Sequence, residues 1–128
     1  AWRAVAVGDS CLFHVRGGKL LAAFPVDSPA GFGNQPRLVP SSAALACPEP
    51  DWLAGRADPG DLLLLATDAV AAAILSDGEL AEALGVVRDA LTARDAGPLL
   101  DWFGRVQSAH NDDASLVAVR LPDAPEAP

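Results

Sequence analysis

The chain has 128 residues, 51% of them hydrophobic, and its 17 acidic and 9 basic residues give a formal net charge of −8. This length predicts one domain with a modest core, and the apolar fraction excludes a disordered chain. The negative charge argues against binding to nucleic acid or to anionic membrane surfaces, because both partners require a cationic face. An ordinary acidic surface explains the charge, and so do carboxylates that hold divalent cations.

Two cysteines, Cys11 and Cys47, lie far apart and have no partners at metal-binding spacing. Two such thiols in a chain without a recognisable targeting segment indicate a reducing compartment, so we expect a cytoplasmic protein. No apolar run is long enough to cross a bilayer.

The first part of the chain predicts an antiparallel sheet. Strands are expected over residues 2–7, 10–15 and 19–24. Gly17 and Gly18 form a two-residue hairpin signal, because a type I′ turn needs positive φ at both central positions. Residues 25–40 are rich in Pro, Gly, Asn and Ser and predict a long irregular loop. A short strand is expected over residues 41–47 and a loop over residues 48–58.

The second part alternates helices with two strands. Residues 61–66 form a continuous apolar run of strand length, and Thr67 or Asp68 is a natural N-cap for a helix over residues 70–75. Apolar spacing predicts helices over residues 79–93 and 99–109. A last strand is expected over residues 114–121. Residues 122–128 are rich in Pro and acidic residues and are expected to form a disordered tail.

Aspartates stand at the ends of three of these predicted strands. Asp9 follows the first strand, Asp68 follows the apolar run, and Asp112 and Asp113 precede the last strand. Carboxylates converging from different strands would form a site for a hard cation. Each also has a simpler interpretation: Asp9 as a turn residue, Asp68 as a helix cap, and the adjacent pair as solvated surface charge.

Three motifs occur in a characteristic order: GDS at residues 8–10, TDA at residues 67–69 and NDDAS at residues 111–115. Together they resemble the C-terminal half of the metal-dependent PP2C (PPM) family of serine/threonine protein phosphatases, and most closely a bacterial branch of it. The segment 23–34 is similar to that branch as well. The resemblance covers residues 2–121, which we therefore treat as one portion of a PP2C-like domain.

The resemblance implies an α+β fold in which two antiparallel β-sheets pack together, flanked by helices, with this chain covering about half of it. It implies hydrolysis of phosphoserine or phosphothreonine in proteins by a water that two Mn²⁺ or Mg²⁺ ions activate. Asp68 and Asp112 would be metal ligands, and Asp9 would help to hold a third ion. Alignment on Ser115 places Asp113 where the family carries asparagine. The family implies no covalent intermediate, so no residue is assigned as a nucleophile.

The family's N-terminal half, with its DGxGG motif and the aspartate that bridges the two metals, has no counterpart in this sequence. The chain also contains no methionine. We therefore expect a fragment of a longer protein, inactive alone, whose partners are the missing half of the domain and a phosphorylated protein made by a cognate kinase. The alternative is a non-catalytic PP2C-like module for regulation or binding.

Overall fold

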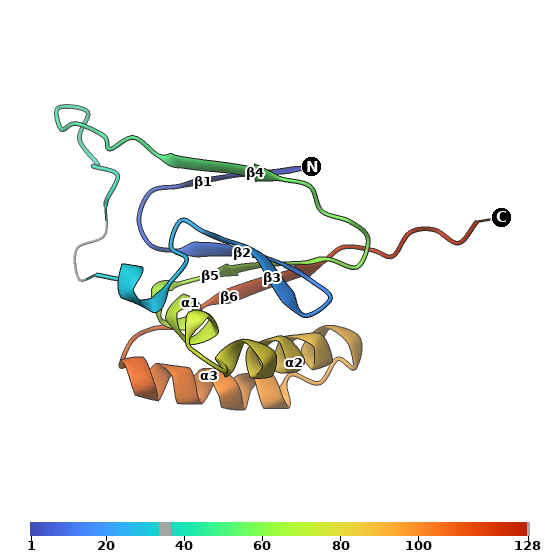
Figure 1. Cartoon of the computed structure of the whole chain (residues 1–128). Coiled ribbons are helices and arrows are strands. Elements are labelled where there is room, and N and C mark those ends of the chain that lie inside the picture. The colour runs from blue at the N-terminus through green and yellow to red at the C-terminus, as the bar shows by residue number, and fades with distance from the viewer. Residues whose placement is uncertain (34–36, 128) are drawn as a thin grey trace.

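The computed structural model describes residues 1–33 and 37–127 and has the mixed α+β architecture expected from the sequence (Figure 1). Six strands, three α-helices and one 3-10 turn are formed within these residues. In chain order they are β1 (Trp2–Ala6), β2 (Cys11–Arg16), β3 (Lys19–Phe24), η1 (Pro29–Gly31), β4 (Asp51–Gly55), β5 (Leu62–Ala66), α1 (Asp68–Leu75), α2 (Glu79–Thr92), α3 (Gly97–His110) and β6 (Leu116–Arg120).

Four strands form an antiparallel sheet in the order β3-β2-β5-β6. The β2–β3 hairpin turns at Gly17 and Gly18, whose φ angles of 57° and 77° confirm the turn expected from the sequence. Strand β5 lies in the centre, with Leu64 opposite Phe13 of β2 and opposite Ala118 of β6. Because side chains alternate across a strand, Leu64 and its neighbour Leu65 point to opposite faces of the sheet.

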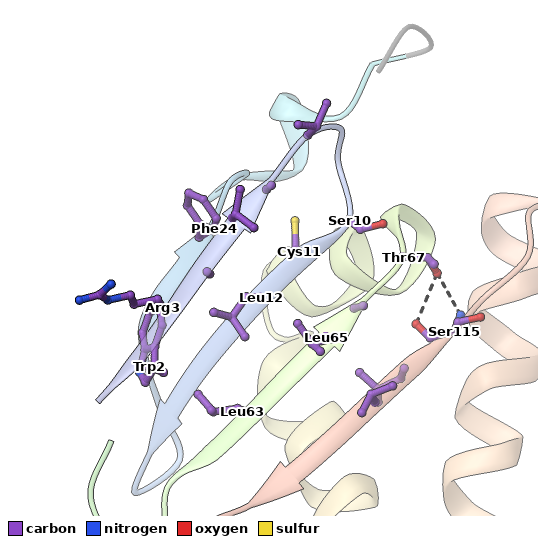
Figure 2. A pocket seen from close by; sticks show the side chains of 17 residues that line it. Trp2, Arg3, Ser10, Cys11, Leu12, Phe24, Leu63, Leu65, Thr67 and Ser115 are labelled. Atoms are coloured by element: carbon purple, nitrogen blue, oxygen red, sulfur yellow. Dashed lines mark hydrogen bonds between the residues drawn. The ribbon is translucent and has the colours of Figure 1, made fainter. Parts of the chain in front are cut away.

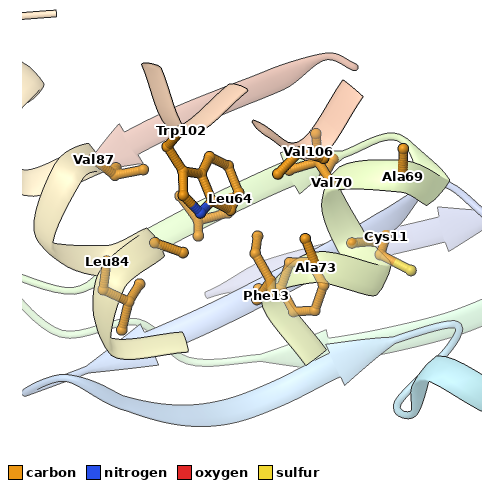
Figure 3. Packing of buried hydrophobic residues seen from close by; sticks show 14 of the residues in the cluster. Cys11, Phe13, Leu64, Ala69, Val70, Ala73, Leu84, Val87, Trp102 and Val106 are labelled. Atoms are coloured by element: carbon orange, nitrogen blue, oxygen red, sulfur yellow. The ribbon is translucent and has the colours of Figure 1, made fainter. Parts of the chain in front are cut away.

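The three α-helices cover one face of this sheet, and the hydrophobic core lies between them (Figure 3). Phe13, Leu64 and Val70 are fully buried there, and Trp102 of α3 is 1% exposed. Helix α3 begins at Gly97, two residues before the predicted start, with Pro98 in its first turn. The predicted helices are therefore confirmed, with small differences at their ends.

Strands β1 and β4 form a separate two-stranded antiparallel ribbon on the other side of the sheet (Figure 1). Trp2 pairs with Gly55, and the ring of Trp2 lies edge-on to the ring of His14 in β2, with 5.7 Å between centroids. A Cβ atom on Gly55 would stand 2.3 Å from the Trp2 indole, so only glycine leaves room for it. The indole therefore lies between the ribbon and His14 of the sheet.

Two sequence expectations about this region are wrong. Residues 48–58 were expected to form a loop but contain β4, and the strand expected over residues 41–47 is absent, since that segment contains a turn. Strand β4 exists through its pairing with β1, about fifty residues away in the chain, which local sequence does not reveal. Residues 34–36 of the predicted irregular loop, and residue 128 of the predicted tail, lie outside the described residues.

The layers differ in two respects from the expected sandwich. Two antiparallel sheets face each other, but in the described residues the second contains two strands only, and the helices lie on one outer face. Part of the helix-free face of the larger sheet is therefore exposed. Leu65, Val117 and Val119 on that face are 51%, 55% and 45% exposed.

Candidate metal centre

Asp9 lies in the bend that joins the ribbon to the larger sheet, directly after Gly8. Gly8 has a φ of 107°, and a Cβ atom there would stand 3.3 Å from the carbonyl oxygen of Arg37. Glycine is required at this position because other residues rarely adopt that backbone conformation. The tight bend leaves Asp9 half-buried.

Asp68 and Asp112 lie at the same end of the sheet, where Thr67 at the end of β5 is hydrogen-bonded to Ser115 just before β6. We call this set of hydrogen bonds the Thr67–Ser115 clip. The Thr67 amide donates to the Ser115 carbonyl at 3.1 Å, and the Ser115 amide donates to Thr67 Oγ1 at 2.9 Å. The Thr67 hydroxyl also donates to the Ser115 carbonyl at 3.4 Å (Figure 2). The clip fixes the residue before Asp68 against the segment that follows Asp112.

This arrangement corrects the expected role of Thr67. It occupies the N-cap position of α1, but its hydroxyl bonds to Ser115 and makes no side-chain bond to a helix amide. The Asp68 carboxylate instead accepts a hydrogen bond from the amide of Ala69, at 2.9 Å. Asp68 therefore makes the side-chain hydrogen bond at the start of α1, and its alternative role as a metal ligand stays a prediction.

The charges of the other two aspartates act on the carboxyl of Asp9. Burial raises the pKa of the Asp9 carboxyl, and the negative charges of Asp68 and Asp112 raise it further, while a hydrogen bond from its own backbone acts in the opposite direction. A nearby like charge disfavours ionisation. The charges of Asp68 and Asp112 therefore act on Asp9, and the role of the three carboxylates as metal ligands stays a prediction.

The carboxylates do not yet form a complete ligand set. Asp112 accepts a hydrogen bond from the amide of Asp113 at 2.8 Å, and both residues are exposed. Among residues 1–33 and 37–127, no group of three or more His, Cys, Asp or Glu side chains is close enough to hold a metal ion. The carboxylate oxygens of Asp9, Asp68 and Asp112 are nevertheless the type of ligand that Mg²⁺ and Mn²⁺ prefer. Water molecules commonly supply the remaining ligands of such cations.

A cavity of about 600 Å³ separates the ribbon from the larger sheet and opens beside this region (Figure 2). Its lining is mainly apolar and comes from β1, β2, β5 and β6. Ser10, Thr67 and Ser115 line the part next to the aspartates, whereas Trp2 and Arg3 lie at the other end. Asp9, Asp68 and Asp112 are not among the lining residues, but Ser10 and Thr67, which follow Asp9 and precede Asp68 in the chain, are.

A second acidic group, missed in the sequence, lies at the opposite end of β5. Asp61 is 1% exposed and accepts hydrogen bonds from His14 Nε2 at 2.7 Å and from Arg16 Nε and Nη2 at 2.8 Å each. The amide of Asp58 also donates to it at 2.8 Å. These donors, chiefly Arg16, hold the pKa of Asp61 well below its usual range.

Each of these hydrogen bonds stabilises the ionised form of Asp61, and together they connect β2 to the start of β5. The network also gives His14 and Arg16 a defined partner within the fold. Arg16 and Asp61 are neighbours because Val15 pairs with Leu62 in the β2–β5 register. The sequence alone does not show this register, so it could not reveal the network.

Comparisons with protein-family models, curated proteins and solved structures find no match to this chain. Within the described residues, no helix is both long enough and apolar enough to span a membrane.

Proposed function

We propose that this chain is part of a metal-dependent phosphatase of the PP2C type, which hydrolyses phosphoserine or phosphothreonine in proteins. The observation that supports this function best is the hydrogen bonding of Thr67 in the second motif to Ser115 in the third, because it holds these two motifs together at one end of the sheet. The negative charges of Asp68 and Asp112 also raise the pKa of Asp9 in the first motif. The reaction and substrate class come from the motif resemblance. The two unpaired thiols, Cys11 and Cys47, agree with a cytoplasmic location.

In this function Asp68 and Asp112 bind the catalytic cations and Asp9 contributes to an accessory ion. The Thr67–Ser115 clip holds together the two segments that carry Asp68 and Asp112. Bound Mn²⁺ or Mg²⁺ supplies Lewis acidity, activating water and neutralising phosphate charge. The half-buried position of Asp9 strengthens its attraction for a cation, because the effective dielectric constant is lower away from bulk water.

The remaining ligands and the bridging aspartate come, in this proposal, from the N-terminal half of the domain. The exposed apolar residues Leu65, Val117 and Val119 support this partner, because they continue the face that the β1–β4 ribbon covers only in part. Further strands packed on this face would bury them. We expect the present chain alone to have little or no phosphatase activity.

A metal titration with matched variants tests the metal site separately from catalysis. Thermal unfolding of the chain is followed with increasing Mn²⁺ or Mg²⁺, for the wild type, Asp112→Asn and Asp113→Asn. A ligand that binds only the folded state adds about 2.7 kcal/mol of stability at 100 times its Kd. We expect a metal-dependent shift that Asp112→Asn reduces and Asp113→Asn largely retains.

The outcomes separate the alternatives. A shift lost with Asp113→Asn but kept with Asp112→Asn would place the ligand one residue later. If no divalent cation changes the stability of the chain or of the complete protein, the proposal of a metal-dependent enzyme is wrong. The non-catalytic PP2C-like module would then be the better interpretation.

A further inference from the structure

A second cavity lies far from the aspartates, between the β2–β3 hairpin, helix α2 and the ends of β5 and β6 near Gly60 and Arg120. Its volume is about 270 Å³. Figure 1 shows the turn of the hairpin next to helix α2. Apolar side chains of Val15, Leu62 and Leu84 contribute to its lining. The space is equivalent to roughly nine water molecules at about 30 Å³ each, so it suits a ligand of similarly few heavy atoms.

The same cavity carries two guanidinium groups and a polar, glycine-rich edge. Arg88 of α2 and Arg120 at the end of β6 both line it, together with Gly17, Gly18 and Gly60. A Cβ atom on Gly17 or Gly18 would meet nothing within 4 Å, so the hairpin leaves open space beside the cavity. In a chain with a net charge of −8, two arginines on one small apolar cavity form a local site for negative charge.

The protein itself places a carboxylate at this site. Arg120 Nη2 donates to Oδ1 and Oδ2 of Asp123, at 2.8 and 3.0 Å, and Asp123 Oδ1 stands 3.5 Å from the Cβ position of Gly60. The Asp123 side chain is 74% exposed, so this pair is weak. Within residues 1–33 and 37–127, Arg88 forms no ion pair.

We propose that this cavity binds a small organic carboxylate, whose apolar body contacts Val15, Leu62 and Leu84 and whose carboxylate binds Arg88 and Arg120. Asp123 acts as an internal competitor that occupies Arg120 when the ligand is absent. Guanidinium groups suit this ligand because they bind carboxylates through paired, charge-assisted hydrogen bonds. The site is independent of the proposed phosphatase function.

Two-dimensional NMR of the full chain with benzoate as the probe tests this site. We expect benzoate to shift the amide signals of Gly17, Gly18 and Gly60, and benzyl alcohol or inorganic phosphate to bind much more weakly. Benzyl alcohol lacks the charge, and phosphate lacks the apolar body. Arg88→Ala should weaken benzoate binding about tenfold, since a hydrogen bond to a charged group contributes about 1.5–3 kcal/mol.

Asp123→Asn should strengthen benzoate binding, by up to about fivefold, because an exposed ion pair contributes at most about 1 kcal/mol. Arg56→Ala, an exposed arginine outside the cavity, is the matched control and should leave affinity unchanged. Equal affinities for the wild type and Arg88→Ala would overturn the assignment. So would equal binding of benzyl alcohol, shifts confined to other regions, or no binding by either the wild type or Asp123→Asn up to the solubility limit of benzoate.

Discussion

Two adjacent leucines of β5 test how the layers are arranged, because they point to opposite faces of the same strand. Leu64 is 0% exposed beneath the helices, and Leu65 is 51% exposed on the helix-free face. Leu64→Ala removes buried methyl and methylene groups and leaves a cavity, at a cost of about 3 kcal/mol within a usual range of 2–5 kcal/mol. The Leu65 side chain is only half buried, so Leu65→Ala loses about half of the roughly 2 kcal/mol that full burial of a leucine side chain contributes, or about 1 kcal/mol.

Urea unfolding followed by circular dichroism measures both variants. With a slope of about 1.5 kcal/mol per molar urea, Leu64→Ala should lower the midpoint by about 2 M and Leu65→Ala by about 0.7 M. Equal losses, or a larger loss for Leu65→Ala, would refute the assignment of the helix-covered face. In a longer protein containing the proposed N-terminal half, Leu65→Ala should become markedly more costly, while the cost of Leu64→Ala should change little.

Three further predictions concern the acidic groups and the bend. The low pKa of Asp61 stabilises the fold fully at pH values above the ordinary aspartate pKa of about 3.9, and this contribution is lost as the pH falls below it. Asp61→Asn should therefore lower stability at neutral pH and make stability depend less on pH in the acid range. An unchanged acid limb of the stability–pH curve would contradict the hydrogen-bonded network. Gly8→Ala should cost more than about 1 kcal/mol in thermal unfolding, since φ is 107° there; a neutral effect would argue against this bend. In the complete protein, Asp112→Asn should abolish most Mn²⁺-dependent hydrolysis of p-nitrophenyl phosphate and Asp113→Asn should not, whereas strong activity from this chain alone would show that other groups build the site.

The elements that the sequence predicts well are those set by neighbouring residues. The β2–β3 hairpin follows from Gly17 and Gly18, which both adopt positive φ. Helix α2 follows from apolar positions at helical spacing, with Leu84 and Val87 buried. In both cases the interactions that define the element lie within a few residues, so local patterning is sufficient.

The elements that sequence reasoning missed depend on distant partners. Strand β4 contains Asp51 and Gly55 and has little local strand character; pairing with β1 forms it. The Asp61 network likewise requires β2 and β5 to be paired before Arg16 and His14 reach the carboxylate. The three metal-ligand candidates could be named from sequence because strand-end aspartates in motifs are recognisable one at a time, and their role stays a prediction. The Thr67–Ser115 clip between β5 and β6 was not recognisable in that way.

Negative charge is stabilised by basic partners at one end of β5 and, in the described part of the chain, lacks such partners at the other end, and this difference bears on function. At one end, Asp61 receives hydrogen bonds from a histidine, an arginine and a backbone amide, so its ionised form is stabilised. At the other end, Asp9 is half-buried near Asp68 and Asp112, and none of the three forms an ion pair within the described residues.

The raised pKa of Asp9 means that the ionised carboxylate destabilises the folded state at neutral pH. Its contribution to stability is greatest at low pH, where the carboxyl is protonated, and is lost as the pH rises through the folded-state pKa. A divalent cation placed among Asp9, Asp68 and Asp112 would supply the positive charge that Asp61 obtains from Arg16. Added Mn²⁺ should consequently stabilise the chain more at pH 7 than at pH 4, where protonated carboxyl groups bind metal poorly. An equal effect at both pH values would show that the cation binds elsewhere.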